Sequence, residues 1–131
     1  MGIDIYARWN TQTEDEKAAQ VTGFSIDAGN LGYLREAYHG EPYATHVLVP
    51  ETFSDEVSLQ YTEGVPISAQ TLRERLPETV QVALKREKAI YGHAPEHPEA
   101  QLIVKSLEDF VSLCEDKEAE SGEPCSFIAS Y

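Results

Sequence analysis

Basic side chains are scarce in this sequence. Its 131 residues include 10 lysines and arginines against 23 aspartates and glutamates, which gives a formal net charge of −13. An acidic excess of this size repels phosphate backbones and anionic lipid surfaces. We therefore expect neither nucleic acid nor membrane as a partner. A protein with a basic surface is the macromolecular partner that the charge favours.

Cysteine and long apolar runs are also limited. Cys114 and Cys125 are the only cysteines, and no stretch approaches the roughly 20 apolar residues that cross a bilayer. The start, Met1 to Asp4, lacks the cationic residues and apolar run of a secretory signal. These features favour a cytoplasmic protein with two buried free thiols. A bridge between Cys114 on a helix and Cys125 on a strand is the alternative.

The rest of the composition is that of an ordinary globular chain. Hydrophobic residues make up 41% and charged residues 25%, and no repeat, linker or low-complexity tract divides the sequence. A chain of this length buries about two thirds of its unfolded surface, which is enough for one core without disulfides or metals. We expect a single domain over residues 1–131.

Alternating apolar residues predict several strands. Over residues 2–9, Ile3, Ile5 and Ala7 share one face, which is typical of a strand with one buried side. Alternation or β-branched composition predicts further extended segments at 24–26, 43–49, 57–61 and 125–131. We expect the C-terminal strand to pair with the N-terminal one, which places both chain ends in one sheet.

Helical periodicity is strongest in the second half. Apolar residues recur at helical spacing over about 98–121, and Gly122 is a natural stop. Ser68 is expected to cap a helix that ends before Pro77, and Pro77 to begin another. The mixed charges around 73–88 are typical of a solvated helix face.

Shorter helices are predicted in the first half. Thr13 and Glu16 form a capping box, in which each side chain satisfies a free backbone amide at the start of a helix. Apolar spacing also favours a helix over 31–39. Together these patterns predict an α+β fold, with a mostly antiparallel sheet that includes the N- and C-terminal strands, packed by two or three helices from the second half.

Side chains capable of chemistry concentrate between Gly32 and His46. This segment holds three of the 7 tyrosines and two of the 4 histidines. On a helix over 31–39, side chains three or four residues apart would share a face. Arginine binds phosphate or carboxylate, tyrosine stacks on rings, and histidine exchanges protons near neutral pH. The candidate ligand-binding residues are Tyr33, Arg35, Glu36, His39, Tyr43 and His46.

A structural role explains the same segment. Tyr38 fits a core position, Arg35 and Glu36 can pair at the surface, and His39 favours the negative end of a helix. The glycines at 29–32 have neither the Walker spacing nor G-x-G-x-x-G, and Asn30 as a turn or cap residue accounts for them. Both interpretations stay open on the sequence alone.

No catalytic or metal-binding pattern is present. His93 and His97 are four residues apart, but Pro95 and Pro98 favour a loop rather than a helix, and no C-x-x-C spacing occurs. No serine has a G-x-S-x-G context, and Cys114 lies on an apolar stripe, where a thiol is usually inert. We expect no metal, no cofactor and a binding role rather than an enzymatic one.

The start M-G-I-D-I-Y and the run G-Y-L-R-E-A-Y-H-G at 32–40 resemble small bacterial and phage-borne proteins of uncharacterised activity. The resemblance covers most of the chain and implies no ligand, cofactor or site residue. Three functions are therefore considered. The first is an acidic module that binds another protein. The second is a small-ligand or nucleotide-binding protein, or a small enzyme, with its site at 33–46. The third is a nucleic-acid mimic.

Overall fold

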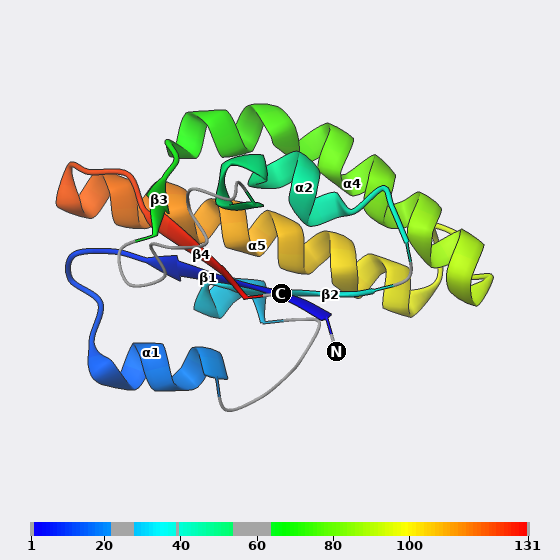
Figure 1. The fold of residues 1–131 in the computed structure, drawn as a ribbon, viewed down its shortest axis with the longest axis horizontal. Coiled ribbons are helices and arrows are strands. Elements are labelled where there is room, and N and C mark those ends of the chain that lie inside the picture. Colours follow the sequence, from blue (N-terminus) through cyan, green and yellow to red (C-terminus); the bar gives the residue numbers. More distant parts are fainter. Residues whose placement is uncertain (1, 22–27, 39, 54–63, 131) are drawn as a thin grey trace.

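A four-stranded antiparallel sheet forms the centre of the protein. The computed structural model describes residues 2–21, 28–38, 40–53 and 64–130, and within them the strand order is β2-β1-β4-β3. The strands are β1 (Gly2–Arg8), β2 (Tyr33–Ala37), β3 (Val65–Pro66) and β4 (Ser126–Ser130). β1 pairs with β4, so both chain ends lie in the sheet, as predicted (Figure 1).

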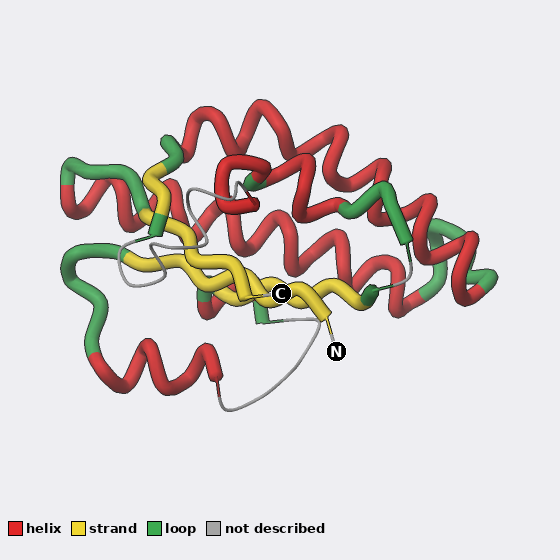
Figure 2. The backbone as a smooth tube through the Cα atoms, viewed as in Figure 1, coloured by secondary structure: helices red, strands yellow, loops and turns green. Residues whose placement is uncertain are grey.

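Two long helices lie side by side over one face of the sheet, and a short helix lies on its other side (Figures 1 and 2). The long pair is α4 (Ala69–Tyr91) and α5 (Pro98–Ser121), and the short one is α1 (Glu14–Val21). The remaining helical elements of the described segments are α2 (Ala44–Leu48), η1 (Gly29–Leu31) and η2 (Pro50–Phe53). The predicted α+β fold, with helices from the second half on an antiparallel sheet, is confirmed.

The core lies between the sheet and the two long helices. Ile3 and Ile5 of β1 point into it, and Phe110 of α5 packs on Phe127 of β4 with ring centroids 5.7 Å apart. These side chains are almost completely buried. Because successive strand residues point to opposite faces, Asp4 and Tyr6 lie on the face away from α4 and α5, which we call the outer sheet face.

Local capping signals determine the helix ends. Thr13 and Glu16 exchange both hydrogen bonds of the predicted capping box, at 2.9 and 3.1 Å. The Ser68 hydroxyl accepts from the backbone N–H of Thr71 at the start of α4. Gly92 and Gly122 end α4 and α5 in the left-handed conformation, which glycine adopts without steric cost.

The predicted helix over 31–39 is wrong, because residues 33–37 form β2. This strand pairs with β1 through five residue pairs, from Gly2 opposite Ala37 to Tyr6 opposite Tyr33. Apolar spacing at Leu34 and Ala37 fits a helix, but an isolated helix of about nine residues is marginal in water. Pairing with β1 buries Leu34 toward the helices and Tyr33 on the outer sheet face.

Two further expectations are wrong at helices. Residues 43–49 are not extended, since 44–48 form α2. Pro77 does not begin a new helix, because α4 continues through it from 69 to 91. Proline inside a helix costs about 3 kcal/mol. Leu76 and Thr79, close to Pro77 in the sequence, are buried, and their burial stabilises this part of α4.

Gly29 lies where the chain passes close to α5. A Cβ atom at this position would lie 1.8 Å from the carbonyl oxygen of Ser106, so only glycine fits. The Gly29 amide donates to the Ser106 hydroxyl at 2.9 Å. The glycine-rich segment is therefore a packing contact with α5, and this amide is already bonded.

Other expectations concern the surface and the thiols. The predicted strands at 24–26 and 57–61 lie outside the described residues. Cys114 and Cys125 are buried and free, as expected.

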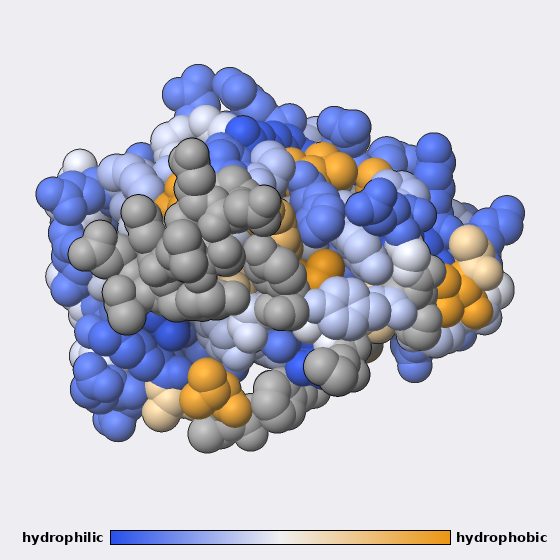
Figure 3. Space-filling model, in the orientation of Figure 1, coloured by the Kyte–Doolittle hydropathy of each residue, from blue (hydrophilic) through white to orange (hydrophobic). Residues whose placement is uncertain are grey.

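No helix in the described segments is long and apolar enough to span a bilayer. The face drawn in Figure 3 is mostly hydrophilic, with small separate apolar patches.

Replacing Phe110 with alanine tests the position of the core. We expect the free energy of unfolding to fall by about 3–5 kcal/mol, because the ring is fully buried and its removal leaves a cavity. Urea unfolding measures this loss. Leu102→Ala on the same helix is the control, since Leu102 is 38% exposed and should cost less than about 1 kcal/mol. Equal losses would contradict this packing.

Candidate functional site

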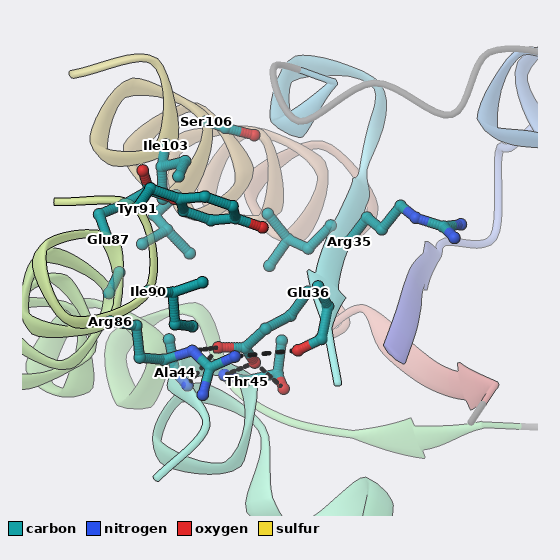
Figure 4. A pocket seen from close by; sticks show the side chains of 14 residues that line it. Arg35, Glu36, Ala44, Thr45, Arg86, Glu87, Ile90, Tyr91, Ile103 and Ser106 are labelled. Atoms are coloured by element: carbon teal, nitrogen blue, oxygen red, sulfur yellow. Dashed lines mark hydrogen bonds and ion pairs between the residues drawn. The ribbon is translucent and has the colours of Figure 1, made fainter. Parts of the chain in front are cut away.

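The six candidate residues do not converge on one place. Tyr33 and Arg35 point to the outer sheet face, whereas Glu36 points toward α2 and α4 (Figure 4). Tyr43 and His46 lie at α2 on the side of Glu36. His39 lies outside the described residues. Successive side chains of β2 point to opposite faces of the sheet, so Tyr33 and Arg35 are separated from Glu36. On a helix these side chains could have shared one face.

On the outer sheet face, Asp4 of β1 contacts both Tyr33 and Arg35 of β2. It accepts a hydrogen bond from the Tyr33 hydroxyl, and one of its oxygens lies 3.0 Å from Nη1 of Arg35. The Tyr6 ring packs on Tyr33 with centroids 5.3 Å apart. Burial is the largest cause that raises the pKa of Tyr33 to about 12, and the bond to Asp4 acts in the same direction. Tyr33 therefore stays a neutral hydrogen-bond donor.

Glu36 binds the start of α2. Its carboxylate accepts from the backbone N–H groups of Ala44 and Thr45 at 2.7 and 3.0 Å, and from the Thr45 hydroxyl at 2.7 Å. The Nε of Arg86 lies 3.1 Å from the same carboxylate, and both side chains are only 11% exposed. Glu36 thus has four donors around it, which leaves little capacity for a ligand.

Arg86 holds the chain between β2 and α2 against α4. Its guanidinium donates to the backbone carbonyls of Ala37 and Pro42 at 2.9 and 3.1 Å, and to that of Gly40. It also lies over the Tyr43 ring, 4.7 Å from its centroid, a favourable cation–π contact. Arg86 and Glu36 therefore form a structural clamp.

His46 belongs to a group of rings beside this clamp. Its imidazole packs on Tyr43 and Phe53, with centroids 5.1 and 4.1 Å apart. Arg86 thus brings Glu36, Tyr43 and His46 into one neighbourhood, although the mixed charges around 73–88 predict a solvated helix face. The structure corrects that prediction, because the guanidinium is largely buried.

A cavity of about 130 Å³ lies between β2, α2, α4 and α5. Its walls are mostly apolar, and Figure 4 shows Arg35 directed away from it, toward β1. The carboxylate-bearing residue Glu87 also lines it, and Glu36 and Arg86 lie at its α2 side. The apolar lining residues are Leu34, Ala37, Ala44, Ala83, Ile90, Ile103 and Leu107.

Glu87 is a member of this lining that no sequence motif singles out. It is only 8% exposed, and its Oε2 lies 2.9 Å from Nδ1 of His93. Ala83 and Glu87 are four residues apart on the buried face of α4. The stripe of buried positions along this helix was the available signal, because it places a carboxylate where an apolar residue is expected.

Three metal-ligating side chains meet where α4 turns into α5. Glu87, His93 and Glu99 have ligand atoms within 4.8 Å of one another, and we call them the turn cluster. The His93 ring stacks on the His97 ring, with centroids 3.7 Å apart and planes 10° apart. His97 in turn caps α5, since its Nδ1 accepts from the backbone N–H of Glu99 at 3.1 Å.

A second, more open hollow of about 320 Å³ lies beside Trp9, Pro66 and Pro124. The indole N–H of Trp9 is buried there without a hydrogen-bond partner among the described residues. The polar side chains around it are already engaged, because Arg8 donates to Gln20 and Asn10 donates to Glu123. This hollow is the weaker candidate, since it is open and has no buried charge.

The Cys114 thiol is poorly placed as a nucleophile. Cys114 lies on the buried face of α5, and Cys125 lies next to it in the core. A hydrogen bond with Cys125, together with burial, raises the pKa of the Cys114 thiol well above its ordinary value. A protonated, enclosed thiol is unreactive.

No protein-family model matches the chain, and no curated protein or solved structure matches it.

Replacing Tyr33 with phenylalanine tests the raised pKa. Tyrosine ordinarily titrates at about pH 10, so the folded state holds this proton more strongly than the unfolded state. The contribution of Tyr33 to stability is complete below about pH 10 and is lost as the pH rises toward about 12. We expect the stability difference between the wild type and Tyr33→Phe to shrink across this interval. Urea unfolding at a series of pH values measures it, and a constant difference would contradict the assignment.

Replacing Glu36 with glutamine tests the clamp. We expect a loss of about 2 kcal/mol or more in the free energy of unfolding, because Arg86 keeps a largely buried charge without its partner. The control is Arg73→Gln, which breaks an ion pair with Glu115 whose side chains are 44% and 40% exposed. Exposed pairs contribute less than about 1 kcal/mol. If both variants lose equally little stability, Glu36 does not hold α2 in place.

Proposed function

We propose that the protein binds a small amine in the cavity between β2, α4 and α5. The observation that carries the proposal is a buried carboxylate, Glu87, in an otherwise mostly apolar cavity. Small-ligand sites combine apolar walls with a few polar groups that orient the ligand. The apolar walls would hold the body of the amine, and Glu87 its ammonium group.

The size of the cavity limits the ligand. Its volume is about 130 Å³, whereas an engineered protein cavity of about 150 Å³ binds benzene. A ligand of roughly six to eight non-hydrogen atoms fits this space. A nucleotide is too large for this cavity. Of the small-ligand and nucleotide alternatives, only the small ligand therefore fits.

The charge of Glu87 supports the choice of a cation. One carboxylate oxygen lies 2.9 Å from Nδ1 of His93, which leaves the carboxylate further capacity to accept hydrogen bonds. An ammonium group would donate a charge-assisted hydrogen bond to it, and the net charge of −13 raises the local concentration of cations.

The other candidate functions have less support. Exposed carboxylates occur on α1, at Glu14 and Asp15, as well as on α4 and α5, and these helices lie on opposite sides of the sheet (Figure 1). A nucleic-acid mimic needs its carboxylates in rows on one face. An acidic surface of this kind steers association with basic proteins, but it selects no particular face for them.

Titration with simple amines tests the proposal. Benzylamine, cyclohexylamine and isopentylamine each join an apolar body to one ammonium group, and NMR of the labelled protein would locate their binding. We expect at least one of them to shift the amide signals of Ala83, Ile90 and Ile103. Affinities of roughly micromolar to millimolar are reasonable for ligands of this size.

Ala83→Leu is the matched variant, because Ala83 is a buried lining residue and a longer side chain there enters the cavity. We expect it to abolish the shifts while the protein stays folded, and Glu87→Gln to weaken binding of the amines. Benzyl alcohol is the uncharged control and should bind more weakly than benzylamine. Shifts that persist in Ala83→Leu, or no shifts with any of the three amines, would rule out this site.

A further inference from the structure

The geometry assigns a binding site for a first-row divalent transition metal ion to the turn cluster, with Glu87, His93 and Glu99 as ligands. The site goes beyond the amine proposal and does not depend on it. It lies at the edge of the cavity, because Glu87 belongs to both. Its other two ligands lie outside the cavity lining.

The spacing of the ligand atoms fits a single ion. Nδ1 of His93 lies 2.9 Å from Oε2 of Glu87 and 3.8 Å from Oε2 of Glu99. Zinc binds nitrogen and oxygen ligands at about 2.0–2.2 Å, which separates two ligands of a tetrahedral ion by roughly 3.3 Å. The two measured distances lie on either side of this value. Glu99 has a 58% exposed side chain, so it can adjust its position readily.

The central ligand, His93, is held in place before any metal arrives. Gly92 turns the chain in the left-handed conformation after α4, and the backbone N–H of His93 donates to the carbonyl of Glu87 at 3.3 Å. Its ring is stacked on His97, which is fixed in turn as the cap of α5. Ligands that are oriented by their neighbours bind metals more tightly than mobile ones.

The chemistry of the cluster selects the class of ion. An imidazole with two carboxylates suits zinc and its neighbours, whereas Mg²⁺ prefers oxygen ligands alone. Two carboxylates balance the charge of a divalent ion. Binding through Nδ1 uses the neutral tautomer of His93 that carries its proton on Nε2. Three protein ligands leave at least one position for water.

Zinc binding by the untagged full chain tests the site. Competition between the protein and a chromogenic chelator at neutral pH measures the dissociation constant for Zn²⁺, and we expect one ion per chain with roughly micromolar affinity. His93→Asn, Glu87→Gln and Glu99→Gln should each weaken binding by about tenfold or more. Glu99→Gln changes an exposed side chain, so it should leave the fold intact even if the other two variants are unstable.

Two neighbouring substitutions are the controls. Glu96→Gln removes an exposed carboxylate outside the cluster, and His97→Asn removes the second imidazole but keeps a good helix cap. We expect Glu96→Gln to bind Zn²⁺ within about threefold of the wild type, since Glu96 neither supplies nor orients a ligand. We expect His97→Asn to weaken binding less than the ligand substitutions do, because its ring orients His93 without contacting the ion. The assignment is overturned if the wild type does not bind, if Glu99→Gln binds as tightly as Glu96→Gln, or if Mg²⁺ binds as tightly as Zn²⁺. Failure of zinc binding leaves the amine result unaffected, because the amine shifts are measured without metal.

Discussion

The carboxylate of Glu36 holds three separate segments of the chain in fixed positions. It projects from β2, binds the backbone amides at the start of α2, and pairs with Arg86 of α4. Arg86 then binds the carbonyls of the chain between β2 and α2. Without this clamp α2 would have no cap, because Tyr43 at its start provides no side-chain hydrogen bond. The clamp therefore fixes the α2 side of the cavity, and the cavity depends on it.

Where a signal is local, the sequence was sufficient to predict the fold. The bounds of α5 and the cap of α4 follow from residues within one turn of each end, such as Ser68 and Gly122. Where the deciding interaction is distant, the prediction was wrong. Residues 33–37, within the predicted helix, form a strand because they pair with β1, and α2 is capped by Glu36, eight residues before it. No pattern within either segment shows such partners.

The same limit explains the candidate site. Polar and aromatic side chains are frequent between Gly32 and His46, and in the structure several of them make contacts within the fold. These residues are Tyr33, Arg35, Glu36 and Tyr43. They bind Asp4, α2 and Arg86, so they connect the parts of the fold. The groups proposed to bind a metal lie on both sides of a turn, so no single helix or strand period relates them. Glu87 and Glu99 belong to different helices, and only the turn at Gly92 brings them together. Zinc binding at the turn cluster would contradict the expectation, drawn from the sequence, that the protein binds no metal.

The cavity and the turn cluster share one side chain, Glu87, and both proposed ligands are cations, in agreement with the charge of −13. A buried carboxylate in a mostly apolar cavity is the central claim. The most direct measurement is a crystal structure of the protein grown with benzylamine. We predict the aromatic ring between Ala83 and Ile103, with the ammonium nitrogen within about 3 Å of the Glu87 carboxylate. A cavity closed by side chains, or benzylamine bound only elsewhere on the surface, would contradict the account.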